Sequence, residues 1–312
     1  MKKYAPLLAN IVSQVLFGLA FYFIKMGMAV VEQDTVKFLS FRFGLGFVAM
    51  TVVWLLGIQK TRYREKKGLI WMILLCGLFN PMISQILETT STTYAPTSQI
   101  ALYNSLLPIV MIGFSALINR EYPTKRQLLF VVLGVLGVLV ANLADKTEGG
   151  VSTLGMLLIA GTIIVIAIQR VWLRRTSAHF SSFEIIYITT GMGAVWFNLL
   201  SLGKHMMTAP LSTYLDGLLC PEFAISILYM GIGSCVFAFL LMTYAAANLP
   251  FAVYSATSTL STAISIVAGV VLLGETFRPV EVLGTVIILL SIVGMSLSYD
   301  KNDDNRMKVR QK

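Results

Sequence analysis

Hydrogen-bonding side chains recur at helical spacing within two otherwise apolar stretches of the sequence, residues 97–118 and 251–273. The first contains Gln99, Tyr103 and Asn104, and residues four apart lie on one helix face, so Gln99 and Tyr103 share a side. The second contains hydroxyl groups at steps of four, three and four residues, namely Tyr254, Ser258, Ser261 and Ser265. The larger side chains favour a wet cavity that hydrogen-bonds a polar small molecule, whereas serines alone more often serve the close packing of membrane helices.

Charged side chains also fall within or at the ends of apolar stretches: Lys25, Arg42, Glu88, Arg170 and Glu184. A charge at the centre of a bilayer costs at least about 2.5–3.5 kcal/mol, so each of these residues needs a structural or functional reason. Lys25, Arg42 and Glu88 are expected at a similar depth near one face of the bilayer, and Arg170 and Glu184 near the opposite face. One interpretation is therefore a pair of gates, with Glu88 pairing Arg42 or Lys25 and with both acids as candidates for proton coupling.

The alternative for these charged residues is structural. Long side chains near the ends of a span extend to the interface, and this is the preferred interpretation for Lys25. Arg170 lies close to Arg174 and Arg175, so it fits an anchor that sets the orientation of its span. For Arg42 and Glu88 the gate and the interfacial interpretation stay equally open.

Two amides, Gln14 and Gln85, are further candidates for lining a cavity, because Gln85 lies three residues before Glu88 on a shared helix face. No enzyme motif accompanies these groups: the sequence has no HExxH, GxSxG or GxxxxGK[ST] pattern. The three cysteines lack CxxC spacing, and the two histidines are far apart. We therefore expect no catalytic residue, no bound metal and no cofactor.

The composition identifies the solvent around these groups. The 312 residues are 56% hydrophobic and 12% charged, and the mean hydropathy is +0.78. A soluble domain is about 45–50% apolar and about 25% charged, so water cannot be the main solvent around this chain. The apolar stretches are continuous rather than alternating, which favours helices over a barrel. The net charge of +9 comes mostly from residues that flank these stretches, so we expect a lipid bilayer and no nucleic acid as partner.

The apolar stretches predict ten membrane-spanning helices in an all-α membrane protein. They are Leu7–Val31, Val36–Ile58, Leu69–Leu87, Thr97–Ile118, Leu128–Leu143, Leu154–Leu173, Ile185–Leu202, Phe223–Ala247, Phe251–Leu273 and Val280–Ser298. Lys and Arg residues concentrate on the side that holds both ends of the chain, so both termini are predicted to be cytoplasmic. The tail, residues 300–312, has mixed charge and is expected to be a disordered cytoplasmic segment.

An internal repeat follows from an offset of 154 residues, which relates Pro96 to Pro250 and Glu121 to Glu275. The two glutamates are expected to cap helices in the turns that they occupy. Each half, residues 1–148 and 149–299, then holds five spans. An odd number of spans requires the second half to be inserted upside down, which is a recurring design around a midplane site.

The sequence resembles the EamA-type branch of the drug/metabolite transporter superfamily over nearly its whole length. The resemblance rests on Gly18 followed by Lys25, on the pair Arg42-Phe43, on the stretch from Ala95 to Glu121, and on the Gly274-Glu275 repeat of that stretch. Two positions depart from the pattern, since Arg120 and Phe130 stand where glycines are expected.

The resemblance implies export or exchange of small metabolites, such as amino acids, across the plasma membrane, with the fourth and ninth spans lining a central cavity. We therefore expect a secondary transporter that works by alternating access, binds a small-molecule substrate, and lies in the cell membrane, either alone or as a homo-oligomer. An intramembrane enzyme acting on a lipid and a non-transporting receptor or scaffold are the alternatives.

Overall fold

The computed structural model of the chain is helical throughout the residues that it describes. These residues are 4–57, 59, 67–104, 106–119, 125–143, 152–208, 210–249, 251–275 and 278–297. The helices of the first half are α1 (Ala5–Val30), α2 (Thr35–Leu55), α3 (Ile70–Gly77), η2 (Leu78–Ile83), α4 (Ser84–Tyr94), α5 (Thr97–Asn104), α6 (Leu107–Asn119) and α7 (Lys125–Leu143). Those of the second half are α8 (Thr153–Thr176), α9 (Ser182–Thr208), η4 (Leu211–Thr213), η5 (Asp216–Leu219), α10 (Pro221–Leu228), η6 (Tyr229–Ala238), α11 (Phe239–Asn248), α12 (Phe251–Leu273) and α13 (Pro279–Leu297).

Six of these helical segments are long and apolar enough to cross a membrane, and shorter apolar helices accompany them within the described residues. Within the described residues, each of the ten ranges expected from the sequence overlaps one or more helices. Large apolar side chains cover the outside of the bundle, for example Leu199 on α9, Val271 on α12 and Leu283 on α13. An apolar exterior of this kind suits lipid rather than water, so the chain is an all-helical membrane protein.

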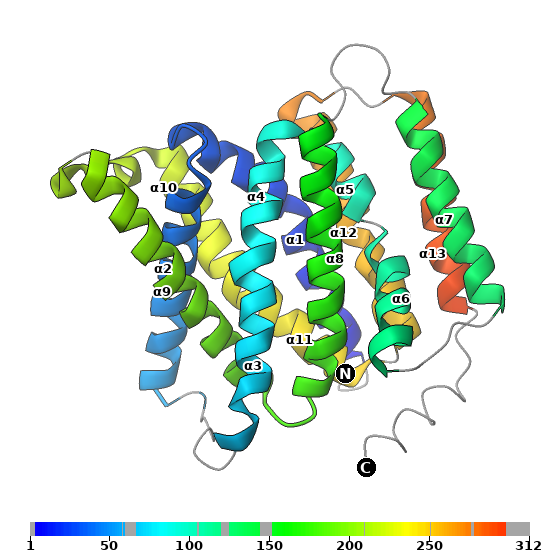
Figure 1. Cartoon of the computed structure of the whole chain (residues 1–312), viewed down its shortest axis with the longest axis horizontal. Helices are drawn as coiled ribbons and strands as arrows, with labels where there is room; N and C mark the ends of the chain where they lie inside the picture. The colour runs from blue at the N-terminus through cyan, green and yellow to red at the C-terminus, as the bar shows by residue number, and fades with distance from the viewer. Residues whose placement is uncertain are drawn as a thin grey trace.

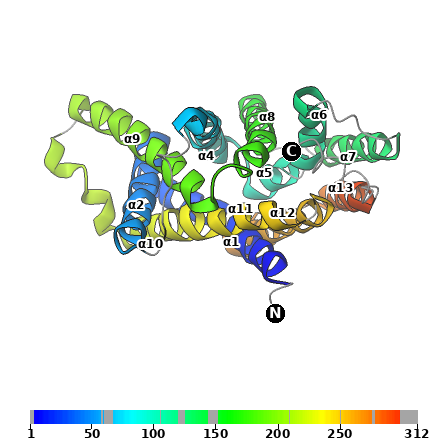
Figure 2. The same ribbon diagram turned by 90° about the horizontal axis from the view of Figure 1, so that it is seen from below.

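The helices form two groups that face each other across the middle of the molecule. Seen from one end, α4 and α8 lie on one side, and α1, α11 and α12 lie on the other (Figure 2). Helix α1 packs along α12, α2 packs along α9, and α7 lies beside α13 at one edge (Figure 1). Helix α1 begins and α13 ends at the same end of the bundle (Figure 1).

Three irregular segments interrupt the long helices near their centres. Asn80 has φ −140° and ψ 114°, so the segment Lys67–Tyr94 bends there, immediately before Pro81. Helix α5 ends at Asn104, and α6 begins only at Leu107. The eighth span contains the π-helical segment η6 between α10 and α11. Irregular backbone at membrane depth is tolerated where it lines a cavity or is buried in protein.

Helices α1 and α12 approach closely because Gly18 has no side chain. Ser265 Oγ donates a 2.8 Å hydrogen bond to the carbonyl of Gly18. A Cβ atom at position 18 would lie 2.6 Å from Ile264 Cβ and 3.0 Å from the carbonyl oxygen of Ser261. Ser265 is therefore one of the small hydroxyl residues that let two membrane helices pack tightly.

A salt bridge ties the C-terminal end of α1 to the loop after α12. Lys25 Nζ lies 2.7 Å from Glu275 Oε1, and the same oxygen accepts a 2.7 Å hydrogen bond from the backbone N–H of Thr97, at the start of α5. The sequence suggested an interfacial position for Lys25. Its side chain is mostly buried within the protein, with 24% exposed, and pairs with a carboxylate whose side chain is 11% exposed. Glu275 thus joins three helices at one end of the bundle.

The close approach at Gly18 predicts that Gly18→Ala lowers stability. The added methyl group overlaps Ile264 and the α12 backbone, and overpacking of this kind typically costs about 1–3 kcal/mol. Gly113→Ala is the matched control, because no atom lies within 4 Å of the corresponding Cβ. Thermal unfolding of the purified variants should show a lower midpoint for Gly18→Ala alone. Equal midpoints for the two variants would contradict this packing.

The Lys25–Glu275 pair predicts energetic coupling between the two residues. In a double-mutant cycle with Lys25→Met and Glu275→Gln, contacting groups commonly couple by about 0.5–3 kcal/mol, so the double variant should lose less stability than the two single losses combined. Lys204 and Asp34 form a matched control pair at 2.6 Å, in which Lys204 is 59% exposed. An exposed pair contributes about 0–1 kcal/mol. Strict additivity at Lys25 and Glu275 would show that their contact is not made.

Candidate binding cavity

A cavity of about 140 Å³ lies between the two groups of helices. Its polar lining consists of Gln14, Arg42, Asn80, Gln85, Glu88, Asn104, Arg170, Ser234, Ser261, Thr262 and Ser265. Its apolar lining consists of Phe17, Ala20, Phe21, Ile24, Ala101, Leu107, Met111, Ile163, Ile166, Met230 and Phe239. The residues from α1 span Gln14 to Ile24, the middle of that helix, so the cavity lies midway along the bundle.

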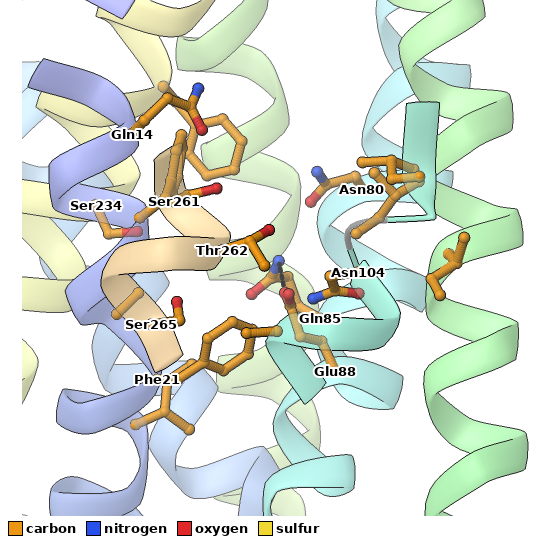
Figure 3. A pocket seen from close by; sticks show the side chains of 18 of the residues that line it. Gln14, Phe21, Asn80, Gln85, Glu88, Asn104, Ser234, Ser261, Thr262 and Ser265 are labelled. Carbon is orange, nitrogen blue, oxygen red and sulfur yellow. Dashed lines mark hydrogen bonds between the residues drawn. The ribbon is translucent and has the colours of Figure 1, made fainter. Parts of the chain in front are cut away.

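The polar side chains converge from opposite walls. Gln14, Ser261 and Thr262 come from α1 and α12, and they face Asn80 and Asn104 across the cavity (Figure 3). The figure also shows Gln85 and Glu88 of α4 beside Asn104. Groups that can hydrogen-bond a ligand thus lie on both sides of one cavity.

The irregular segments of the fold supply part of this lining. Asn80 lies in η2 at the bend of the third span, Asn104 is the last residue of α5, and Ser234 lies in η6. Each residue comes from a place where regular α-helix is interrupted. The interruptions therefore bring polar side chains to the cavity, as broken helices do in other membrane proteins.

Residues related by the offset of 154 line the same cavity. Asn80 corresponds to Ser234, Leu107 to Ser261, and Met111 to Ser265, and all six side chains lie on its wall. Gln85 corresponds to Phe239, which also lines it. The η2 and η6 segments correspond under the same offset. The correspondence places equivalent parts of the two halves around one space, and in three of the four pairs a polar residue corresponds to an apolar one.

A chain of hydrogen bonds connects the buried charges. Arg42 Nη1 donates to Gln85 Oε1 at 2.6 Å, and Gln85 Nε2 donates to Glu88 Oε2 at 3.0 Å. The side chain of Asn104 also hydrogen-bonds Glu88, and both Arg42 and Arg170 attract its carboxylate electrostatically. Arg42 is only 3% exposed. A buried arginine and glutamate of opposite charge thus share one amide, which lowers the cost of holding both in the bundle.

The other contacts of Arg42 are weaker. Its Nε donates to Cys235 Sγ at 3.3 Å, and its Nη2 reaches Ser234 Oγ at 3.5 Å. Sulfur is a weak acceptor, and 3.5 Å is long for a hydrogen bond. The guanidinium group therefore retains capacity to bind a stronger acceptor within the cavity.

The structure brings together most, but not all, of the residues singled out from the sequence. Those that line the cavity are Gln14, Gln85, Asn104, Ser261, Ser265, Arg42, Glu88 and Arg170. Tyr103 packs in the hydrophobic core instead, and neither it nor Gln99 is among the lining residues. The side chains of Tyr254 and Ser258 lie outside the described residues.

Glu88 does not end its helix, as the sequence had suggested. The predicted span ended at Leu87, but α4 continues to Tyr94, so Glu88 lies inside the helix and faces the cavity. Arg170, expected in a separate layer near the opposite face, lines the same cavity as Glu88 and Arg42. Arg42, Glu88 and Arg170 therefore line one cavity, whereas the sequence had suggested two separate layers.

Glu184 and Lys25 lie elsewhere. Ser181 N donates to Glu184 Oε2 at 2.9 Å, and Glu184 N donates to Ser181 Oγ at 3.2 Å. This reciprocal pair is a capping box at the start of α9. Lys25 takes part in the salt bridge with Glu275 described above. Neither residue is among those that line the cavity.

Sequence reasoning missed Asn80 and Ser234, as well as the aromatic residues Phe17, Phe21 and Phe239. A signal existed for Asn80, because an asparagine directly before Pro81 in an apolar span marks a bend. The offset of 154 then leads from Asn80 to Ser234. The phenylalanines carry no comparable signal, since aromatic residues are common throughout these spans.

Comparisons with known proteins agree with this architecture. The "EamA-like transporter family" model matches twice, over residues 5–143 and 153–297. The chain is 28% identical over 295 residues to the uncharacterized transporter YcxC of Bacillus subtilis (strain 168), covering 94% of this chain and 93% of that protein. It is 26% identical over 169 residues to the uncharacterized transporter YvbV of the same organism, covering 54% of each.

A solved crystal structure shares the fold, with a TM-score of 0.64 at 16% identity, over 93% of this chain and 96% of that one. The two family matches together span both halves that wall the cavity. The chain therefore belongs to the EamA-like transporter family of the drug/metabolite transporter superfamily, with two EamA domains.

Proposed function

We propose that the protein is a secondary transporter that moves small metabolites, such as amino acids, across the plasma membrane by alternating access, as an exporter or an exchanger. The observation that carries this proposal is the charged cavity midway along the bundle. Buried charges are costly in a membrane, and they commonly mark a substrate or ion pathway. Membership of a transporter family favours this function over an intramembrane lipid enzyme and over a non-transporting receptor or scaffold.

The proposed mechanism is a movement of two inverted five-helix halves, residues 1–148 and 149–299, with both termini in the cytoplasm. The paired cavity residues Asn80 and Ser234 support this symmetry, as does the common end at which α1 begins and α13 ends. In inverted-repeat transporters the two halves rock around a fixed site near the midplane. Here that site is the cavity.

Lys25 and Glu275 form the gate in this scheme. Their salt bridge joins α1 and α5 of the first half to the end of α12 in the second half. The contact lies near the C-terminal end of α1, so the proposed gate is at that end of the bundle. Opening toward that side requires the salt bridge to break, and Glu184 at the start of α9 remains the candidate for a role at the other end.

The cavity predicts that transport depends on Gln85. In proteoliposomes that carry a panel of unlabelled amino acids, exchange of the corresponding labelled compounds should exceed that in protein-free liposomes. Gln85→Leu removes the acceptor of Arg42 and a donor to Glu88. A hydrogen bond to a charged group is worth about 1.5–3 kcal/mol, so the rate should fall about tenfold or more.

Leu199→Ala serves as the matched control, because Leu199 lies on the outside of the bundle with 66% exposed. Its rate should equal that of the wild type. An exchange rate in Gln85→Leu equal to that of the wild type would show that the cavity is not part of the transport pathway. Absence of exchange for the whole panel in wild-type proteoliposomes would contradict transport of amino acids.

A further inference from the structure

The charged groups of the cavity do not balance. Its charged lining residues are Arg42, Arg170 and Glu88, so two guanidinium groups face one carboxylate among the described residues. The lining contributed by α1, α6, α11 and α12 contains no ionisable side chain. An excess of positive charge within a membrane protein is unfavourable, and a bound anion reduces it. The net charge of the lining therefore favours an anionic group over a cationic one.

The protein already contains a binding arrangement for one carboxylate. Gln85 and Asn104 hydrogen-bond Glu88, and Arg42 and Arg170 attract it. These are the amide and guanidinium donors that recognise carboxylates in binding sites generally. Glu88 lies on α4 at the edge of the cavity and faces the open volume (Figure 3). The carboxylate of a ligand could therefore use the same cations.

Arg42 is the cation best placed to do so. Its strong hydrogen bond goes to Gln85, a neutral acceptor, at 2.6 Å. Its Nε and Nη2 groups reach only Cys235 at 3.3 Å and Ser234 at 3.5 Å. Carboxylates bind a guanidinium group through two parallel hydrogen bonds, which neither a thiol nor a hydroxyl provides. A ligand carboxylate would replace these weak contacts.

The remainder of the cavity suits an apolar body of limited size. Phe17, Phe21 and Phe239 line it together with aliphatic side chains. Ser261 and Thr262 lie on the same wall as Phe21 (Figure 3). The volume of about 140 Å³ restricts the ligand to a small molecule. A charged region and an apolar region in one small space match an organic acid with a short hydrocarbon or aromatic body.

A ligand carboxylate and an ionised Glu88 would repel each other, because both lie close to the same cations. A proton on Glu88 removes this repulsion, so a ligand carboxylate can bind beside Arg42 without a competing negative charge. Uptake of that proton and binding of the ligand therefore favour each other, and the linkage is reciprocal. The other charged or titratable groups near Glu88 are Arg42 on α2, Arg170 on α8, and Cys235 on η6, which contacts Arg42.

Resting on the proposed transport function, we infer that the substrate is a small, partly apolar organic acid whose carboxylate binds beside Arg42, and that Glu88 takes up a proton as this carboxylate binds. One proton then accompanies each substrate molecule in the bound state. The inference names the substrate class and gives Glu88 a role within the same cavity.

The experiment measures ligand-dependent thermal stabilisation of the purified full-length protein, which depends on affinity by mass action. The probes are two acid–amide pairs: 3-phenylpropionate with 3-phenylpropanamide, and L-phenylalanine with L-phenylalaninamide. Both acids should stabilise the wild type, and both amides should not. Between pH 8 and pH 6 the affinity for the acids should increase, by up to about tenfold per pH unit for one linked proton.

Variants separate the roles of the residues. Glu88→Gln imitates the protonated acid, so it should bind the acids tightly at every pH. Its matched control is Glu222→Gln, because Glu222 is an exposed residue at the start of α10, and this variant should keep the wild-type pH dependence. Arg42→Gln should abolish binding and Arg42→Lys should weaken it, while Lys204→Gln at an exposed position should change nothing.

Several results would overturn the inference: equal stabilisation by acids and amides, no stabilisation by any probe, or a pH dependence that survives in Glu88→Gln. Circular dichroism identifies a variant that fails to fold. If Arg42→Gln fails to fold, the wild-type acid–amide comparison and Glu88→Gln still test the inference.

Flux in proteoliposomes distinguishes the two proposals. If acids and amides both cross, the transporter stands and the carboxylate site fails. If acids bind as described but nothing crosses, the site stands and the transport function fails.

Discussion

The cost of holding the charges of Arg42 and Glu88 inside a membrane-embedded bundle is the constraint on which the rest of the structure depends. An ion moved from water to hydrocarbon loses its hydration, and the loss is recovered only by close partners of good geometry. Gln85 provides these partners for both residues, with hydrogen bonds of 2.6 and 3.0 Å. Such an arrangement needs walls on all sides. Helices from both EamA domains supply them, which is why neither domain encloses the cavity alone.

The irregular backbone segments help to meet this constraint, because they supply polar side chains near the centres of the helices. A regular apolar helix offers few polar atoms at its centre, whereas the bend at Asn80, the end of α5 at Asn104 and the η6 segment each direct a polar side chain to the cavity. The close packing of α1 and α12 at Gly18 brings the hydroxyl residues of α12 to the opposite wall. Ser265 has both roles: it donates a hydrogen bond to the carbonyl of Gly18, which joins α12 to α1, and it also lines the cavity.

The sequence allowed the helix positions to be predicted because stretch length and hydropathy are local properties. The repeat could also be predicted from the offset of 154 residues, and the family model matches the chain twice, over residues 5–143 and 153–297. The position of Glu88 within its helix could not be predicted, because α4 continues through the hydroxyl-rich stretch up to Tyr94, where hydropathy falls but the helix persists. The partner of Lys25 was hidden for a different reason: Glu275 is 250 residues away in the chain, and only the fold brings them together.

The most direct test of a wet cavity shared by both domains is the reaction of single cysteines with a small, water-soluble methanethiosulfonate reagent. In a background without the natural cysteines, cysteine would replace Asn104 or Ser261 in the cavity, or Leu199 or Val271 on the apolar exterior. A thiol reacts as its thiolate, which requires water. The account predicts rapid labelling of the two cavity positions and slow labelling of the two exterior ones. Equal, slow labelling at all four positions would contradict it.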